Sequence, residues 1–291
     1  MRLCAIDVGT NTVMSVVADV ADGRLDVVAD EERFARLGQG VDASGRLAEA
    51  AMERVLARLG EALATAERLG AERVVIGATS ASRDAANVGD LQARVRRAYG
   101  VEYGVLTGEQ EAEATFRGAL ALLPGLDRAL VVDIGGGSTE VALGTRSGGV
   151  SARQSVDVGS VRLTERHFAV RPPGGPAVAA AREDAETAYS TVRFERGALP
   201  LVATGSVGRL MARLAGADPV PAAAVRDWRD RLLALTPDAA LAVAPDVLAG
   251  RHDVAAAALL LLAAALDRFR AGAYVPTAGG VRHGLALAAA G

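Results

Sequence analysis

The sequence predicts an α/β protein made of two related domains, and three observations lead to this expectation. The chain has 291 residues, which suits two domains of roughly 150 residues each. Strand and helix signals alternate along it, as they do in mixed α/β folds. The stretch CAIDVGTNTVMSVVA near the N-terminus returns as LVVDIGGGSTEVAL, with Asp133 standing 126 residues after Asp7. Each domain is therefore expected to carry one copy of a strand–turn–strand unit.

The individual elements follow from the spacing of apolar residues. Short apolar runs bounded by turn residues predict strands, and apolar residues at helical spacing predict amphipathic helices. The expected strands are 3–8, 13–20, 25–34, 74–78, 105–106, 130–134, 141–143, 152–158 and 201–203. The expected helices are 44–69, 90–99, 110–122, 160–168, 177–193 and 254–266, within a mostly helical C-terminal third. Ser44 is expected to cap the first long helix, and residues 204–208 are expected to form a turn.

Composition limits the class of protein. The net charge is −3, so the chain is not expected to bind nucleic acid or an anionic membrane. All 32 basic residues are Arg, so every cationic contact to an anion must come from a guanidinium group. The single cysteine, Cys4, lies in an apolar run and is expected to be buried. The apolar run 254–266 is shorter than the ~20 residues of a membrane span, and no signal-like stretch precedes Asp7, so we expect a soluble cytoplasmic protein.

The glycine-rich turn at residues 135–137 is expected to bind oxygen anions. The residues after it, Ser-Thr-Glu-Val-Ala-Leu, alternate as in a strand. Dinucleotide-binding and Walker A loops lead instead into a helix, and the latter end in Lys, so both are excluded. In a hairpin, successive glycines can present several N–H groups as an anion nest. Asp133 would repel a bare phosphate and is better explained as a Mg²⁺ ligand, so the turn suits a phosphoanhydride.

The repetition of this turn strengthens the expectation. Two such turns, facing each other across a cleft, could hold one ligand between two domains. For one turn alone, a tight hairpin with an exposed Asp would explain the pattern as well. For two related turns in one chain, the binding interpretation is favoured.

Two further segments carry polar groups after predicted strands. TSASRDAAN supplies hydroxyls and Arg83 at such a strand end, where α/β folds place ligand-binding groups. An ordinary helix cap at Ser80 or Ser82, with Arg83 in solvent, is the alternative. ATGSVG at residues 203–208 is another strand-to-glycine turn, suited to a phosphate or nucleoside contact. Its order of Gly and Ser does not match a hydrolase nucleophile elbow.

The segment TGEQEAE, residues 107–113, places three carboxylates at the start of a predicted helix. Carboxylates are favoured in a first turn by the helix dipole, so most of these are expected to be capping or solvated. One of them could instead be a general base that polarises a water molecule. Spacing alone does not choose among Glu109, Glu111 and Glu113.

Taken in order, these segments resemble one family. AIDVGTNT, TSASRDAAN, TGEQEAE, LVVDIGGGSTEVAL, DVGSVRLTE, ATGSVG and GGVRHGL follow one another as in the exopolyphosphatase and guanosine-pentaphosphate phosphohydrolase (Ppx/GppA) family. The resemblance implies two related actin-like (ribonuclease H-like) domains flanking a cleft, formed by residues 1–126 with about 280–291 and by residues 127–279. It also implies an enzyme that releases terminal phosphate from inorganic polyphosphate or pppGpp with Mg²⁺, or Mn²⁺, and an activated water. A homodimer is expected by the same analogy.

The family's motifs assign roles to residues of this chain. The family's catalytic residue, the second Glu of a G-x-E-E-A segment, matches Glu111. Its metal-site carboxylates match Asp133 and Glu140, with Asp7 as the counterpart of Asp133 in the first repeat. The residues expected to contact phosphate are Gly9, Thr10, Asn11, Arg83, Gly135, Gly136, Gly137, Ser138, Gly205 and Ser206.

Four positions depart from the family pattern. Gln110 replaces the first Glu of the pair, Met14 stands where many members carry Arg, GSVG alters the usual Gly-Thr turn, and His283 stands where many have Glu. None of these removes the expected base or metal ligand, so we expect an active enzyme. The acidic charge and the lack of an appended helical domain favour short polyphosphate or pppGpp over very long chains. An ATP-dependent kinase or ATPase of the same fold and a non-catalytic polyphosphate or alarmone sensor are the alternatives.

Overall fold

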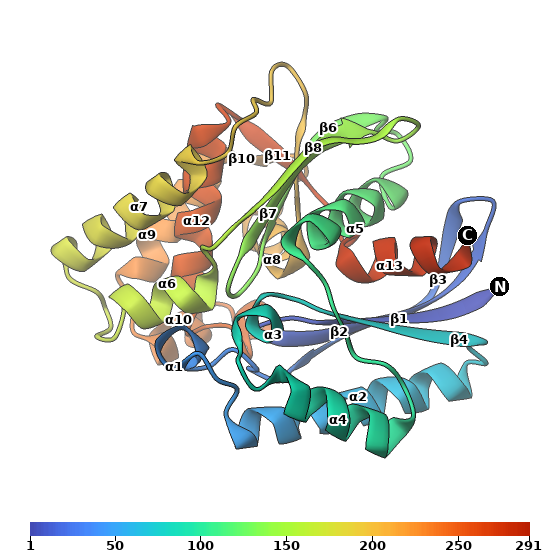
Figure 1. Ribbon diagram of the computed structural model, residues 1–291. Coiled ribbons are helices and arrows are strands. Elements are labelled where there is room, and N and C mark those ends of the chain that lie inside the picture. The colour runs from blue at the N-terminus through green and yellow to red at the C-terminus, as the bar shows by residue number, and fades with distance from the viewer. The chain divides into compact units, whose positions relative to one another are not determined.

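The computed structural model describes residues 1–291, which divide into two compact units. The first unit comprises Met1–Pro124 together with Gly279–Gly291, and the second comprises Gly125–Ala278. Each unit has its own sheet and its own apolar core (Figure 1). The C-terminal segment with the motif GGVRHGL thus belongs to the first unit, so the chain passes between the units twice.

The first unit is built on a five-stranded sheet of order β3-β2-β1-β4-β5. Its strands are β1 (Arg2–Val8), β2 (Thr12–Ala21), β3 (Arg24–Phe34), β4 (Arg73–Ala78) and β5 (Gly104–Val105). Its helices are α1 (Val41–Ser44), α2 (Glu49–Arg68), α3 (Ser80–Asp84), α4 (Val88–Tyr99), α5 (Gly108–Ala121) and α13 (Val281–Ala290). The first three strands form an antiparallel meander, and β4 and β5 add in parallel on the other side of β1. Such parallel neighbours need crossover connections, which the segments containing α2 and α4 supply.

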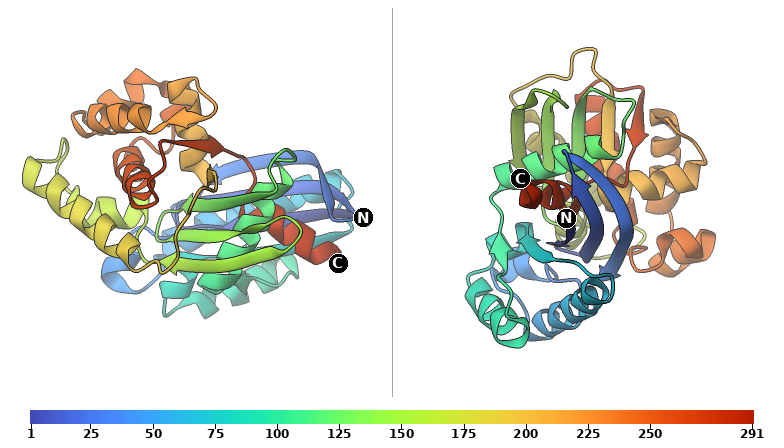
Figure 2. Two further views of the ribbon diagram at one scale, coloured as in Figure 1. Left: turned by 90° about the horizontal axis from the view of Figure 1, so that it is seen from above. Right: turned by 90° about the vertical axis from the view of Figure 1, so that its right-hand side faces the viewer.

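The two faces of this sheet are covered by different helices (Figures 1 and 2). On one face, α2 and α4 pack against β1 and β2 in a core that includes Ile6 and Leu59. On the other face, α13 packs in a smaller core that includes Leu3 and Ala286. Because successive side chains of a strand point to opposite faces, both faces of β1 are apolar, which explains its continuous apolar run.

Helices α5 and α13 cross at a point that has no room for side chains. A Cβ atom built on Gly284 would lie 1.9 Å from the carbonyl oxygen of Ala114, and one built on Gly118 would lie 2.1 Å from that of Gly280. Both positions therefore require glycine, because only glycine allows the backbones to approach so closely. The glycines of GGVRHGL thus serve helix packing, and they fix α5, the helix that carries Glu111.

The second unit contains a six-stranded sheet of order β10-β11-β9-β6-β7-β8. Its strands are β6 (Arg128–Ile134), β7 (Thr139–Thr145), β8 (Gly149–Val156), β9 (Leu201–Thr204), β10 (Val220–Pro221) and β11 (Ala273–Pro276). Its helices are α6 (Ser160–His167), α7 (Gly175–Ser190), α8 (Gly205–Ala215), α9 (Ala222–Leu233), α10 (Pro237–Val243), α11 (Pro245–Leu248) and α12 (Ala255–Arg268). The Ala- and Leu-rich α12 is buried along most of its length, as expected of the run 254–266. None of the helices has the length and apolar character that crossing a bilayer requires.

The two sheets repeat one topology. Strands β6, β7, β8, β9 and β11 take the places of β1, β2, β3, β4 and β5, and β10 extends the second sheet at its edge. The hairpins share one register, since Asp7 lies opposite Met14 and Asp133 lies opposite Glu140. Each turn is also closed by the same backbone bond, Gly9 N–H to Thr12 O at 2.8 Å and its counterpart in the second hairpin at 3.0 Å. The expected α/β fold with two related sheets is confirmed.

Two local expectations are wrong. Ser44 does not cap the long helix: it ends α1, where its hydroxyl donates to the carbonyl of Gly40, and α2 begins only after Ala48. Residues 204–208 are not a turn, because α8 begins at Gly205. The glycines there satisfy local geometry, Gly205 through a positive φ of 69° and Gly208 by lying against the carbonyl of Ala203. Glycine-rich sequence was therefore mistaken for a turn signal.

Cys4 is buried, as expected. Burial raises the pKa of its thiol to about 12, and the charge of Glu31 contributes in the same direction. The thiol therefore stays protonated and unreactive at neutral pH, and Cys4 acts as a small apolar core residue.

Candidate functional site

In the turn at residues 9–12 of the first unit, two carbonyl groups are hydrogen-bonded to the segment of residues 35–38. The Thr10 carbonyl accepts a hydrogen bond from the N–H of Gly38 at 2.8 Å, and the Asn11 carbonyl accepts from the N–H groups of residues 35 and 36 at 3.0 and 2.9 Å. The N–H groups of Thr10 and Asn11 donate no hydrogen bond within the protein. This arrangement leaves two neighbouring N–H groups for an anion, as expected of an anion nest.

The turn of the second unit is arranged in the same way, with helix α6 as the partner. The carbonyl of Gly135 accepts from the N–H of Ser160, and that of Gly136 accepts from the first turn of α6, at 2.8 to 3.1 Å. The Nε of Arg162 donates to the Gly137 carbonyl at 2.8 Å. The N–H groups of Gly136 and Gly137 donate no bond within the protein, so this turn also leaves two donors for an anion.

Sequence reasoning missed the role of α6 in building this turn. A Cβ atom built on Gly159, directly before α6, would lie 2.4 Å from the carbonyl of Gly136, so the close approach depends on a glycine there. Both Gly159 and Arg162 lie in the family motif DVGSVRLTE. The signal was present, but contacts between segments more than twenty residues apart cannot be read from a motif alone.

A row of polar side chains crosses the second sheet beside this turn. Asp133 of β6 lies opposite Glu140 of β7, so their side chains project from the same face. Thr204 of β9 flanks Asp133, and Ser155 of β8 flanks Glu140. Glu140 is 2% exposed, and the Ser155 hydroxyl donates to its Oε1 at 2.7 Å. A Cβ atom on Gly205 would lie 2.4 Å from Asp133 Oδ1, so this glycine makes room for the carboxylate.

These residues fit a hard divalent cation. Their donor atoms are all oxygens, which Mg²⁺ and Mn²⁺ prefer over the softer metals. No group of three or more His, Cys, Asp and Glu residues comes together as a complete metal site in the structure. Mg²⁺ in phosphate chemistry is held by one or two carboxylates and completed by waters and substrate oxygens. The pair Asp133 and Glu140 matches that requirement, and the space at Gly205 keeps the Asp133 carboxylate accessible to the strand end.

The equivalent row of the first unit has a different character. Asp7 lies opposite Met14, with Gly77 of β4 on its other side. The Sδ of Met14 accepts a hydrogen bond from Arg282 Nη1 at 3.3 Å. The same guanidinium pairs with both carboxylate oxygens of Asp30 at 2.7 Å, and Arg282 is 2% exposed. The first row therefore brings no second carboxylate to Asp7 from the neighbouring strands β2 and β4.

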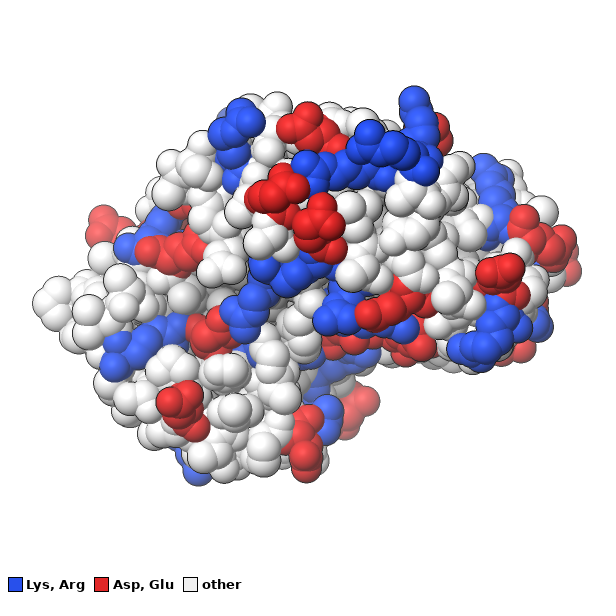
Figure 3. All heavy atoms as spheres, turned by 90° about the horizontal axis from the view of Figure 1, so that it is seen from below, with Lys and Arg blue, Asp and Glu red and all other residues white.

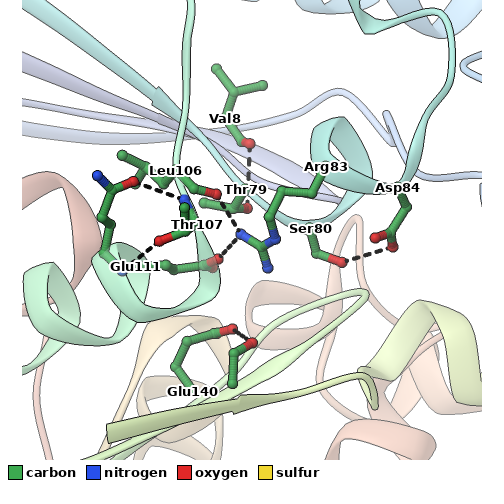
Figure 4. Close-up of polar contacts among 11 residues, drawn as sticks. Val8, Thr79, Ser80, Arg83, Asp84, Leu106, Thr107, Glu111 and Glu140 are labelled. Atoms are coloured by element: carbon green, nitrogen blue, oxygen red, sulfur yellow. Dashed lines mark hydrogen bonds and ion pairs between the residues drawn. The ribbon is translucent and has the colours of Figure 1, made fainter.

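Glu111 and Arg83 are brought together in the first unit (Figure 4). Arg83 Nη1 donates to Glu111 Oε2 at 2.5 Å and to the carbonyl of Leu106 at 3.1 Å. Glu111 is 5% exposed, whereas Glu109 is exposed and Glu113 is paired with a neighbouring Arg on the same helix. Of the three carboxylates, Glu111 is thus the one that is buried and held by Arg83.

The alternative of a simple serine cap before Arg83 is wrong. Thr79 occupies the N-cap position of α3, and no side chain caps that helix. Ser80 contacts Asp84 at 3.3 Å, and the buried Ser82 shares a 2.8 Å hydrogen bond with the hydroxyl of Tyr103. Arg83 is not left in solvent, since its side chain is only 20% exposed.

Gln110 has a structural role that explains why the departure from Glu is tolerated. Thr107 caps α5, with its hydroxyl accepting from the N–H of Gln110 at 3.2 Å. In return, Gln110 Oε1 accepts from the N–H of Thr107 at 2.9 Å. Gln and Glu both complete this capping box, so the substitution preserves the start of the helix that carries Glu111.

The surface carries charges of both signs, as expected from the nearly equal numbers of basic and acidic residues, 32 and 35. On the face shown in Figure 3, Arg side chains are interspersed with carboxylates. Several arginines are engaged in ion pairs, such as the partly exposed Arg94 with Glu49 and Glu53, and the exposed Arg96 with Glu102. Interspersed charges of both signs give no extended electrostatic footprint for nucleic acid on this face.

Comparison with known proteins identifies the family. The model of the Ppx/GppA phosphatase family matches residues 16–290. "Exopolyphosphatase 2" of Mycobacterium tuberculosis is 35% identical over 277 residues, covering 87% of this chain and 86% of that protein. "Guanosine-5'-triphosphate,3'-diphosphate pyrophosphatase" of Vibrio cholerae is 35% identical over 164 residues, covering 56% of this chain and 33% of that protein. The crystal structure of an Aquifex aeolicus Ppx/GppA protein has a TM-score of 0.80 at 27% identity, covering 100% of this chain and 97% of that one. The chain therefore belongs to the Ppx/GppA phosphatase family.

Proposed function

We propose that this protein is a Mg²⁺-dependent phosphohydrolase that releases terminal phosphate from inorganic polyphosphate, with short chains favoured, or from pppGpp. The relatives named above, an exopolyphosphatase and a guanosine pentaphosphate pyrophosphatase, support these two substrates. The observation that carries the proposal is the buried Glu111, held at the start of α5 by Arg83. A carboxylate can act as a general base when it is held in a defined position within reach of the water, and the contact with Arg83 gives Glu111 such a position.

Phosphate oxygens are held by backbone N–H groups. The pair at Thr10 and Asn11 and the pair at Gly136 and Gly137 each offer two adjacent donors without a protein acceptor. Donors of this kind are fixed by the fold, so they need no rearrangement when a phosphate arrives. In phosphoryl transfer, such positioning and electrostatic stabilisation supply most of the rate acceleration.

Asp133 and Glu140 would hold the Mg²⁺, Glu140 through a water molecule. When bound, the ion would neutralise charge on the phosphoryl group that is transferred. The Ser155 hydroxyl fixes Glu140, and Gly205 leaves space beside Asp133, so both carboxylates keep defined positions. Asp7 stands at the equivalent strand end of the first unit and is proposed to contribute to the metal site in the same way.

Glu111 is proposed to accept a proton from the attacking water. Its Oε2 is held by Arg83, which fixes the carboxylate at the start of α5. The proton moves from water to the carboxylate as the new phosphorus–oxygen bond forms, and the terminal bridging oxygen leaves with the shortened chain. Arg83 thus orients the base, in addition to its expected contact with phosphate.

The test is phosphate release, measured in parallel on short polyphosphate, long polyphosphate, pppGpp and ATP, with Mg²⁺, with Mn²⁺ and with EDTA. The proposal expects release from short polyphosphate or pppGpp that EDTA abolishes. Release from ATP alone would support a kinase or ATPase, and tight binding of polyphosphate or pppGpp without release would support a sensor.

A pair of variants tests the proposed base. Glu111→Gln should lower kcat roughly 100- to 10,000-fold, the range of a lost general base. Glu113→Gln is the matched control, because it makes the same change on the same helix, at a partly exposed residue that pairs with Arg117. Near-normal turnover of Glu111→Gln, with the control also active, would remove Glu111 from the mechanism.

A further inference from the structure

Tyr103, a buried residue of the first unit, is hydrogen-bonded to Ser82, the residue before Arg83. The function proposed above gives Tyr103 no role. Tyr103 is 3% exposed and lies between α4 and β5. Its hydroxyl shares a 2.8 Å hydrogen bond with Ser82 Oγ, and Ser82 is 1% exposed. Ser82 directly precedes Arg83, so this bond acts on the backbone from which Arg83 projects.

Three hydrogen bonds join helix α3 to the segment of residues 103–111. Arg83 contacts Glu111 and the carbonyl of Leu106, and Ser82 contacts Tyr103. The first two bonds belong to the guanidinium itself, whereas the third fixes the helix beneath it. Helix α3 has only five residues and no side-chain cap, and so short a helix is not stable by itself. Its orientation must therefore come from contacts such as the Ser82–Tyr103 bond.

Tyr103 is anchored independently of α3. Its ring belongs to the apolar core that includes Leu91 and Val95 of α4, and its carbonyl accepts from Gln92 Nε2 at 3.0 Å. Burial raises the pKa of the Tyr103 hydroxyl, and the charge of Asp7 contributes in the same direction. The hydroxyl therefore remains protonated at any pH at which the enzyme works, and it presents one constant hydrogen-bonding group to Ser82.

We propose that Tyr103 is a positioning residue for the Arg83–Glu111 pair. Its bond to Ser82 holds α3 in the orientation in which Arg83 reaches Glu111 Oε2. This inference rests on the proposed function, because it takes Glu111 as the base. Ser82 lies within the segment TSASRDAAN, directly before Arg83.

The main variant is Tyr103→Phe, which keeps the ring in the core and removes only the hydroxyl. We expect kcat to fall about 3- to 10-fold, the effect of one lost hydrogen bond, with KM changed less than twofold. Tyr99→Phe is the matched control, because its hydroxyl donates to the carbonyl of Leu56 at 2.8 Å in the same unit, away from Arg83. The control should lose a similar amount of thermal stability and keep its kcat.

A double-mutant cycle separates positioning from general loosening. Ser82→Ala and Tyr103→Phe remove the same bond from its two ends, so the double variant should be no slower than the slower single variant. Additive losses in kcat, or a Tyr103→Phe enzyme whose kcat matches that of Tyr99→Phe, would overturn the inference.

A second readout does not depend on turnover. Crystal structures of the two Tyr variants should show Arg83 displaced from Glu111 in Tyr103→Phe and retained in Tyr99→Phe. An unchanged Arg83–Glu111 contact in Tyr103→Phe overturns the inference even if the wild type proves inactive. Failure of the wild type to release phosphate from any substrate counts against the proposed function alone.

Discussion

In the first unit Asp7 faces Met14 across a strand pair, and in the second unit Asp133 faces Glu140 across the equivalent pair. The backbone register and the bond that closes each turn are the same in both. The difference is confined to side chains, and it extends to the neighbouring strand, where Gly77 stands opposite Asp7 and Thr204 opposite Asp133. One scaffold thus supports two kinds of site.

At the position equivalent to Glu140, the first unit has Met14, which lies beside the guanidinium group of Arg282. Arg282 contacts the Met14 sulfur and donates two hydrogen bonds to the Asp30 carboxylate. The first unit therefore keeps N–H donors for an anion and lacks the carboxylate pair, whereas the second keeps both. Under the proposed function, both units would hold phosphate and the second unit would hold most of the metal site.

The largest expected effect comes from giving the second unit the side chain of the first. Glu140→Met should lower Mg²⁺-dependent phosphate release about 100-fold or more, because one of the two proposed carboxylate ligands is lost. Met14→Leu is the matched change in the first unit and should alter release less than twofold. Phosphate release measured against Mg²⁺ concentration checks both. Equal effects of the two variants would contradict the division between the units.

A smaller effect is expected from removing the buried cation of the first unit. Arg282→Leu leaves the Asp30 carboxylate without its bidentate partner, and we expect a loss of about 2 kcal/mol in unfolding free energy, reduced from the full cost of a buried pair because Asp30 is 22% exposed. Arg226→Leu is the control in the second unit, where the pair with Asp267 is exposed and worth less than about 1 kcal/mol. Hydrogen exchange resolves the two units. Equal losses would mean that the buried pair contributes no more than the exposed one.

Gly205→Ala should cost about 1–2 kcal/mol in stability, because φ is +69° there. It should also lower turnover, because the new methyl group would displace the Asp133 carboxylate. Gly216→Ala is the matched control: its φ of +60° is strained in the same way, but nothing lies within 4 Å of its Cβ. Chemical denaturation and phosphate release separate strain from the contact with Asp133. If both variants lose the same activity, the contact with Asp133 is unimportant.

The smallest expected difference between the two units is in their loss of stability at low pH. Ion pairs with Arg lower the pKa of Asp19, Glu49 and Glu102 in the first unit, and of Asp230 in the second. A lowered carboxyl pKa stabilises the folded state above the unfolded pKa of about 4, and this contribution is lost as pH falls below it. Because these pairs are exposed, the first unit should be destabilised only slightly more than the second at pH 3. Hydrogen exchange at pH 3 and pH 7 tests this order, and earlier loss of protection in the second unit would reverse it.

The regular parts of the molecule could be predicted from sequence because local patterns determine them. The repeat at Asp7 and Asp133 predicted two equivalent hairpins, and the motifs predicted the family and the class of enzyme, all of which are confirmed. The roles assigned to individual site residues stay predictions. Ser44 and residues 204–208 were misassigned because a capping residue and a glycine-rich segment each fit two local structures.

The partners of the site residues could not be predicted, because they are distant in the sequence. Arg83 and Glu111 are 28 residues apart, and Arg282 and Asp30 are 252 apart. No periodicity links such positions, and each pair depends on how helices pack on the sheet. The bond between Tyr103 and Ser82 could not be predicted for the same reason, because the two residues are 21 positions apart.

The glycine crossing of α5 and α13 has a consequence for how the chain can be divided. The thirteen residues Gly279–Gly291 fill the face of the first sheet on which Leu3 and Val16 lie, and they contact α5 without intervening side chains. A fragment ending at Pro124 would leave that face open to water and α5 without its neighbour. Such a fragment should aggregate when expressed alone, and a separate peptide of residues 279–291 should restore its solubility, whereas the same peptide with Gly284→Val should not.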